Sequence, residues 1–221
     1  MQPGSGYPVR VRGDLDPGLS RWMWIVKWIL AIPHLVVLIV LHVAYLLVTI
    51  VAFFAILITG RYPRALFDFN VGVMRWSWRV RFYAYSTLGT DRYPPFSLAP
   101  NADYPADLEV DYPEQLHRGL VLIKWWLLAI PQYLIAIALA GMGGRHYHWS
   151  LLPILVIIAA IALLFTGSYP KGLFDFNMGI NRWLYRIRGY VSLMTDVYPP
   201  FRLDQGAREP GDTGSAEVSE A

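Results

Sequence analysis

The residues whose types and spacing could do chemistry are an aspartate and two arginines that recur in two copies of one segment. Each set spans about 60° of a helical wheel, and the two sets are Asp68, Gly72, Arg75 and Arg79, and Asp175, Gly179, Arg182 and Arg186. Guanidinium groups bind phosphate as bidentate forks, and glycine permits close approach. One hypothesis is therefore a cradle for an anionic lipid headgroup or phosphate. The other, which we favour, is that Asp68 and Asp175 form ion pairs with arginines of the other copy.

Two polar residues, His34 and Gln132, occupy equivalent positions within long apolar runs, each directly after a proline. A proline frees the backbone carbonyl four residues earlier, here Ile29 or Leu127, and a polar neighbour can satisfy it. Ionisable residues at membrane depth are functional candidates. Glutamine cannot relay protons as histidine does, so we favour a structural role for both.

No residue pattern indicates an enzyme, a metal site or a cofactor. His146 and His148 lie beside Arg145, but two histidines without a nearby carboxylate or cysteine are an incomplete ligand set. The chain has no cysteine. It also has no recognisable nucleophile triad, paired carboxylates within the apolar runs or glycine-rich phosphate loop.

The composition favours lipid as the solvent of much of the chain. Apolar residues make up 55% and charged residues 16%, against about 45–50% and 25% in soluble domains. The apolar runs 22–59 and 120–166 contain no Asp or Glu. Of the 19 Lys and Arg residues, 18 lie outside the predicted hairpin turns, and only Arg145 lies in one. This distribution explains the basic pI without nucleic-acid binding. It also predicts a cytoplasmic location for both termini and the central connector.

A duplicated unit is evident in the sequence. Residues 59–82 align without gaps on 166–189, with 14 of 24 positions identical, and each copy ends on Tyr-Pro-Pro-Phe, at 93–96 and 198–201. Two parallel copies would be related by a pseudo-twofold axis along the membrane normal.

We predict a transmembrane helical hairpin in each copy, at about 20–59 and 119–166. In copy two, an apolar run of 21 residues ending at Ala140 can span a core of about 30 Å, and a polar, glycine-rich break follows. Copy one lacks about nine residues there, so its turn is expected near His42. The alternative is a continuous helix of about 60 Å.

An amphipathic helix is expected after each hairpin, because glycine followed by proline ends one helix and begins the next. These helices, at about 63–88 and 170–193, mix aromatic residues with arginine, as helices in the headgroup layer do. Lys27 and Lys124 are expected to extend to the membrane surface.

Two short segments alternate as strands do. Residues 9–12 alternate valine with arginine, and residues 108–111 alternate apolar with acidic residues. Opposite charges across a strand pair are favourable. We therefore predict that the two strands pair in one small cytoplasmic sheet, with apolar faces on the amphipathic helices and segments 96–98 and 201–203 as additional strands.

The repeated Gly-x-Tyr-Pro-x-x-Leu-Phe-Asp-Phe-Asn segment, the following Arg-Trp and the closing Tyr-Pro-Pro-Phe resemble the bacterial family called domain of unknown function 4389. The resemblance covers about 7–98 and 104–203. It implies a multipass membrane protein and carries over no catalytic residues.

The predicted fold is an all-α membrane protein of two tandem repeats, each a transmembrane hairpin with an interfacial helix, plus a small β-sheet. The predicted segments are a disordered N-terminus (1–6), repeat one (7–98), a linker (99–103), repeat two (104–203) and a disordered tail (204–221). We expect a non-enzymatic scaffold or accessory subunit of a cell-envelope complex in the plasma membrane. Its partners would be membrane lipids and a membrane or cytoplasmic protein. The alternative is a small transporter or lipid-handling protein with a site between the repeats.

Overall fold

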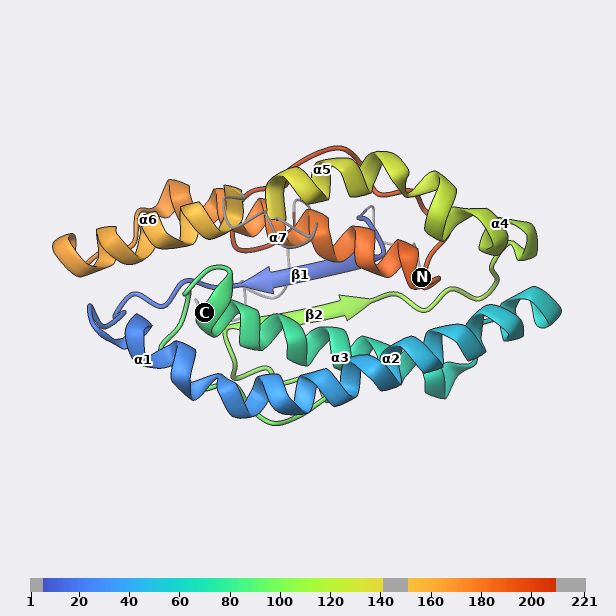
Figure 1. Cartoon of the computed structure of the whole chain (residues 1–221), viewed down its shortest axis with the longest axis horizontal. Coiled ribbons are helices and arrows are strands. Elements are labelled where there is room, and N and C mark those ends of the chain that lie inside the picture. The colour runs from blue at the N-terminus through green and yellow to red at the C-terminus, as the bar shows by residue number, and fades with distance from the viewer. Residues whose placement is uncertain (1–5, 141–150, 210–221) are drawn as a thin grey trace, which may run out of the picture.

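The computed structural model describes residues 6–140 and 151–209, which are mostly helical with one small sheet (Figure 1). The elements are β1 (Val9–Gly13), α1 (Met23–Leu30), α2 (Ile32–Thr59), α3 (Arg64–Val80), π-helix η1 (Arg81–Tyr85), β2 (Ala106–Val110), α4 (Arg118–Ile123), π-helix η2 (Lys124–Leu128), α5 (Ile130–Ala140), α6 (Leu151–Thr166) and α7 (Lys171–Val191). The expectation of a mostly helical chain with a small sheet is confirmed.

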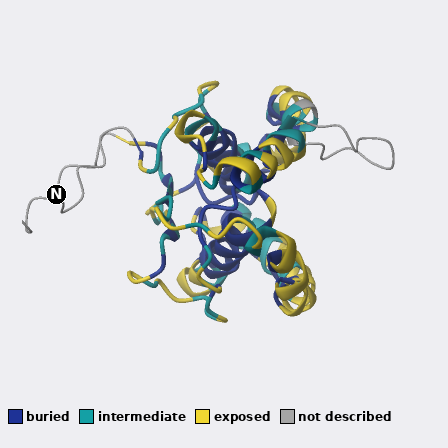
Figure 2. Cartoon of the chain, turned by 90° about the vertical axis from the view of Figure 1, so that its left-hand side faces the viewer, coloured by how far each residue is buried: buried dark blue, intermediate teal, exposed yellow. Residues whose placement is uncertain are grey.

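Helices α3 and α7 form the centre of the molecule. The strands pack on them, β2 against α3 and β1 against α7, while α2 packs on α3 and α5 and α6 pack on α7. Burial follows this arrangement, with the central helices buried and the outer helices widely exposed (Figure 2).

The turn expected near His42 is wrong, because α2 runs without interruption from Ile32 to Thr59. The sequence between His34 and Thr59 contains no glycine or proline, and the His42 ring bonds the Leu38 carbonyl within the helix at 2.6 Å. The break falls instead at Ala31, two residues before Pro33. Figure 1 shows α4, α5 and α6 succeeding one another along one edge, as α1 and α2 do along the other. The turn predicted at 141–148 lies outside the described residues.

Two helical stretches are long and apolar enough to cross a membrane, Ile32–Thr59 and Arg118–Ile137, and α6 is a shorter apolar helix. Only 17% of the most apolar part of α2 is buried, which distinguishes it from the core helix of a soluble protein. Large apolar side chains on the outer helices, such as Ile39, Ile58 and Phe165, are more than half exposed. These helices support association with a membrane.

The predicted strand pairing is confirmed. Strands β1 and β2 are antiparallel, with Arg10 opposite Glu109 and Val11 opposite Leu108. The apolar residues of the pair, including Val11 and Leu108, are buried on the central helices. Segments 96–98 and 201–203 add no strand, since the sheet of the described residues has two strands.

The boundaries expected for the central helices are close to those observed. Gly60 and Gly167 end the preceding helices with φ of +74° and +73°, and prolines precede α3 and α7. The expectation of interfacial helices is wrong, because every residue from Asn70 to Val80 is buried in protein. Helix α3 can be buried because the carboxylate of Asp107 neutralises the charges of its arginines Arg75 and Arg79 inside the protein.

Candidate functional site

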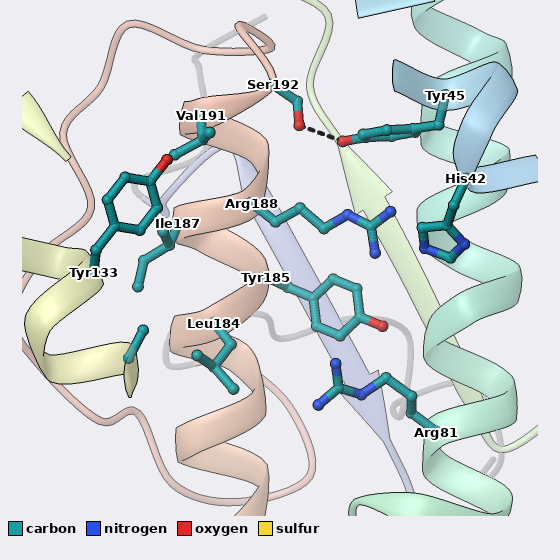
Figure 3. Close-up of a pocket in the computed structure, with 11 residues that line it drawn as sticks. His42, Tyr45, Arg81, Tyr133, Leu184, Tyr185, Ile187, Arg188, Val191 and Ser192 are labelled. Atoms are coloured by element: carbon teal, nitrogen blue, oxygen red, sulfur yellow. Dashed lines mark hydrogen bonds between the residues drawn. The ribbon is translucent and has the colours of Figure 1, made fainter. Parts of the chain in front are cut away.

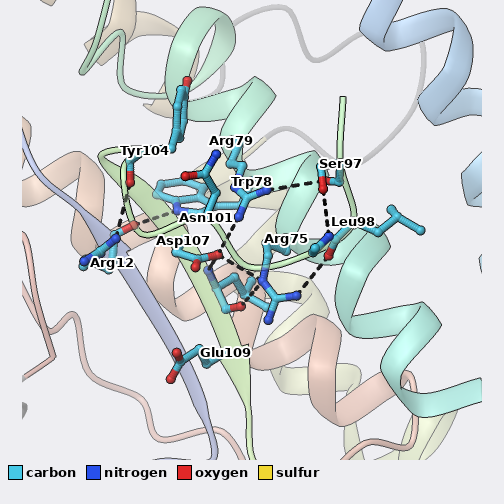
Figure 4. Close-up of polar contacts among 12 residues, drawn as sticks. Arg12, Arg75, Trp78, Arg79, Ser97, Leu98, Asn101, Tyr104, Asp107 and Glu109 are labelled. Atoms are coloured by element: carbon cyan, nitrogen blue, oxygen red, sulfur yellow. Dashed lines mark hydrogen bonds and ion pairs between the residues drawn. The ribbon is translucent and has the colours of Figure 1, made fainter. Parts of the chain in front are cut away.

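In copy one, the predicted arginines converge on a single carboxylate (Figure 4). Asp107 Oδ1 lies 3.0 Å from Arg75 Nε and 3.2 Å from Arg79 Nη2. Arg75 also donates to the carbonyl of Leu108 at 2.9 Å, and Arg79 to that of Ser97 at 3.3 Å. Burial lowers the pKa of the Arg79 guanidinium, and the Asp107 carboxylate acts in the opposite direction.

In copy two, the equivalent arginines are fully buried and are met by the segment that follows the repeat. Glu209 Oε1 lies 3.0 Å from Arg182 Nε, and Asp204 Oδ2 lies 2.6 Å from Arg186 Nη2, which also pairs with Glu209. The prediction of a disordered tail is therefore wrong for residues 204–209, because they neutralise two buried charges. Residues 210–221 and 1–5 lie outside the described residues.

The two aspartates of the predicted sets do not pair with arginines of the other copy, so that expectation is wrong. Asp68 lies 3.1 Å from Arg64 in an exposed pair on its own helix. Asp175 is half-buried and is not a partner of either buried arginine of α7. Carboxylates and carbonyls of the protein surround the four buried guanidinium groups. These ion pairs and hydrogen bonds therefore stabilise the interior of the protein.

His34 and Gln132 are both fully buried and perform the same task in their copies. The His34 ring accepts from Trp76 Nε1 at 3.1 Å and stacks on Phe96 with ring centroids 3.9 Å apart. The Gln132 amide donates to the carbonyl of Pro199 at 2.8 Å. Each therefore fixes the Tyr-Pro-Pro-Phe segment to an outer helix. The expected hydrogen bond from each side chain to the carbonyl that its proline frees is not formed.

Lys27 and Lys124 do not extend to a surface. Both are fully buried, with Lys27 Nζ 2.7 Å from Asp91 and Lys124 Nζ 2.8 Å from Asp196. The expectation is wrong because the chain before each Tyr-Pro-Pro-Phe segment brings a carboxylate back to the helix.

A basic cavity of about 550 Å³ lies between the two copies, where α2 and η1 of the first face α5 and α7 of the second (Figure 3). Its polar and aromatic lining consists of His42, Tyr45, Arg81, Tyr133, Tyr185, Arg188 and Ser192. Its volume is within the range of about 300–1,000 Å³ typical of ligand sites.

Arg81 and Arg188 are equivalent residues of the two copies. Figure 3 shows their side chains reaching into the space between the copies with Tyr185 between them. The Arg188 guanidinium lies 4.7 Å from the Tyr45 ring centroid, and that of Arg81 lies 6.0 Å from the Tyr185 centroid. Within residues 6–140 and 151–209, all other arginines either are exposed or have a carboxylate within ion-pair distance. This pair has neither property.

The sequence carries a signal for this pair outside the helical face that contains Asp68. Arg81 and Arg188 recur in the repeat, two residues after Arg79 and Arg186. Two residues correspond to about 200° on a helix, so they point away from the face that carries Asp68.

An apolar groove adjoins the cavity. It encloses about 480 Å³ along α2, and Tyr45, Val191 and Ser192 line both spaces. Apart from Thr49, its other walls are apolar residues such as Ile50 and Trp125. A charged cavity thus continues into a hydrocarbon-like groove.

The histidines considered as metal ligands, His146 and His148, lie outside the described residues. Among the residues that the structure does describe, no three His, Asp or Glu side chains are grouped as metal ligands would be.

The fold defines a mostly helical protein with apolar outer helices, a buried pair of central helices and a two-stranded sheet. The family model described as Domain of unknown function (DUF4389) matches residues 21–97 and 147–202. The chain belongs to this family. No curated protein and no solved structure matches it.

Proposed function

We propose that the protein is a non-enzymatic scaffold or accessory subunit of a cell-envelope complex, held in the plasma membrane by its outer helices, with both termini cytoplasmic. The observation that carries the proposal is the exposure of apolar side chains along α1–α2 and α4–α6. Figure 2 shows these outer helices coloured largely as exposed. Exposed apolar surface of this extent indicates contact with a membrane or a partner. The charged loops and the sheet are then available to a protein partner.

Both ends of α2 contact one charged connector, residues 86–117. Just ahead of the helix, Tyr93 donates to the carbonyl of Leu30, the last residue of α1, at 3.1 Å. At the other end the Leu116 amide donates to the carbonyl of Gly60, which directly follows α2, at 2.9 Å. The connector contains seven Asp, Glu and Arg residues, which are costly to place in hydrocarbon. Both ends of α2 therefore belong at the same membrane surface, with the helix immersed from that side. Multi-pass insertion is the alternative.

The chain lacks cysteine, so single cysteines can report its topology. Arg21→Cys and Arg61→Cys mark the two ends of α1–α2, and we expect both to react with an impermeant maleimide only after the cytoplasmic side is opened. Labelling of the two ends from opposite sides, or of Gly143→Cys from outside the cell, would instead support multi-pass insertion. Release of the protein by alkaline carbonate would contradict membrane embedding altogether.

A second function, lipid handling between the copies, is supported by the basic cavity. An unneutralised cationic cavity that continues into an apolar groove suits an amphiphile rather than a soluble substrate.

A further inference from the structure

The cavity between the copies has a positive charge that the protein does not compensate. Arg81 and Arg188 face it, and no carboxylate lines it among the described residues. Two like charges in a partly desolvated space repel each other, and a bound anion removes the repulsion. Guanidinium forks match phosphate oxygens in geometry. The lining of the cavity is therefore complementary to an anion.

The hydroxyl groups of Tyr45 and Ser192 lie where the cavity meets the groove. Tyr45 donates a hydrogen bond to Ser192 Oγ, which leaves the serine proton available for an acceptor in the cavity. Both residues also line the groove. An anion on the two arginines would thus have a neutral donor on the side toward the groove.

The groove has the chemistry of an acyl-chain site. Its walls include Leu46, Ile50 and Phe54 of α2, together with Trp125 and Leu193. The same stretch of α2 presents exposed apolar side chains to its surroundings. A chain entering from a bilayer would pass from one apolar environment to another.

We infer that this site binds one anionic phospholipid of the surrounding membrane, with the phosphate on Arg81 and Arg188 and an acyl chain in the groove beside Tyr45. The inference rests on the proposed membrane location. The four buried arginines of the repeated face cannot serve this purpose, because Asp107, Asp204 and Glu209 already neutralise them.

The direct test uses the full chain in nanodiscs of phosphatidylcholine with a minor fraction of phosphatidylglycerol, with bound lipids counted by native mass spectrometry. Wild-type protein should retain phosphatidylglycerol preferentially. Each basic residue near a membrane is worth about fivefold in affinity, so Arg81→Gln with Arg188→Gln should lower the preference about 25-fold. An unchanged preference in this double variant overturns the inference.

The matched control is Arg61→Gln with Arg92→Gln, which removes the same charge from two exposed positions. It should keep the preference, and an equal loss would show a general surface-charge effect and overturn the site. If the glutamine pair does not fold, Arg81→Lys with Arg188→Lys keeps the charge but loses the bidentate forks, and a reduced preference is still expected.

Two further arms separate a lipid from a soluble anion. Leu46→Trp with Ile50→Trp fills the groove and should weaken phosphatidylglycerol binding, whereas Ile39→Trp, exposed and outside the groove, should not. Glycerol 3-phosphate should compete poorly, and full competition would overturn a lipid as the occupant.

Flotation with vesicles tests the membrane location separately. Failure to float with pure phosphatidylcholine vesicles refutes the proposed membrane location. Normal flotation without lipid selectivity refutes this inference alone.

Discussion

Asp107 places its Oδ1 atom 3.2 Å from the guanidinium of Arg79, a side chain with no exposed surface. The carboxylate lies on β2, at the start of copy two, and the arginine on the central helix of copy one. An ion pair between a fully buried arginine and a partly buried aspartate therefore joins the two copies.

Replacing Asp107 by Asn should be strongly destabilising. It leaves the charges of Arg75 and Arg79 buried without a carboxylate, a loss of about 3–5 kcal/mol in the free energy of unfolding. Thermal denaturation in detergent measures the effect. The control is Asp68→Asn, which breaks an exposed pair and should cost at most about 1 kcal/mol. Equal effects of the two substitutions would contradict the internal role of Asp107.

The repeat supplies a matched pair of glycine substitutions. A Cβ at Gly72 would lie 2.8 Å from Leu98 Cβ and 3.1 Å from its carbonyl oxygen, whereas one at Gly179 meets nothing closer than 3.4 Å. Gly72→Ala should therefore cost about 1–3 kcal/mol by overpacking, and Gly179→Ala clearly less. Melting temperatures of the two variants, in the same detergent, decide the point; the reverse order would be inconsistent with this packing.

Local features were predictable from the sequence because short-range chemistry determines them. Opposite charges on two alternating segments predict that the two strands pair, and glycine–proline pairs predict where α3 and α7 begin. The predicted hairpin in copy one is wrong because an apolar run longer than the bilayer thickness does not by itself require a turn. The same apolar pattern fits one continuous helix, whether it crosses the bilayer or lies along it.

The partners of the buried charges were not predictable in the same way. Arg79 and Arg186 find their acids 28 and 23 residues downstream, in segments that nothing local connects to them. Several exposed acids, including Asp68, matched equally well in charge. The cavity at Arg81 and Arg188 depends on how α3 and α7 pack, which helical periodicity alone does not specify.

Charge reversal tests the strand pair in solution. The Arg10 guanidinium lies 3.3 Å from Glu109 and 2.7 Å from Asp111. Arg10→Glu should destabilise the protein by about 0.2–1 kcal/mol, a small effect because the pairs are largely exposed. Adding Glu109→Arg with Asp111→Arg should restore stability, and Arg92→Glu serves as an unpaired control. Denaturant midpoints of these variants measure the changes in stability. If the added arginines do not restore stability, opposite charges do not determine the strand pairing.

Alkaline pH should weaken the fold through a buried tyrosine between α6 and α7. Burial raises the pKa of Tyr169 from 10 to about 12. The folded state therefore holds this proton more tightly than the unfolded state. Its stabilising contribution, on the order of 2 kcal/mol, is complete below pH 10 and is lost as the pH rises toward 12. Tyr169→Phe should reduce the slope of melting temperature against pH over this range. An identical slope would exclude Tyr169 as a contributor.

The buried lysine pairs allow charge to be separated from hydrogen bonding. Asp91 both pairs with Lys27 at 2.7 Å and accepts from the Ser20 amide at 2.6 Å. Asp91→Asn keeps an acceptor for that amide but leaves Lys27 charged and buried, so it should cost about 3–5 kcal/mol. Adding Lys27→Met removes the unpaired charge and should recover most of the lost stability.

The equivalent pair of copy two allows the same experiment, with Asp196→Asn and Lys124→Met. Asp196 pairs with Lys124 at 2.8 Å and also accepts from the His117 amide at 2.7 Å. Unfolding followed by tryptophan fluorescence measures all four variants. If the double variants are as unstable as the single ones, the carboxylates act through backbone geometry, and the lysines are not held by charge.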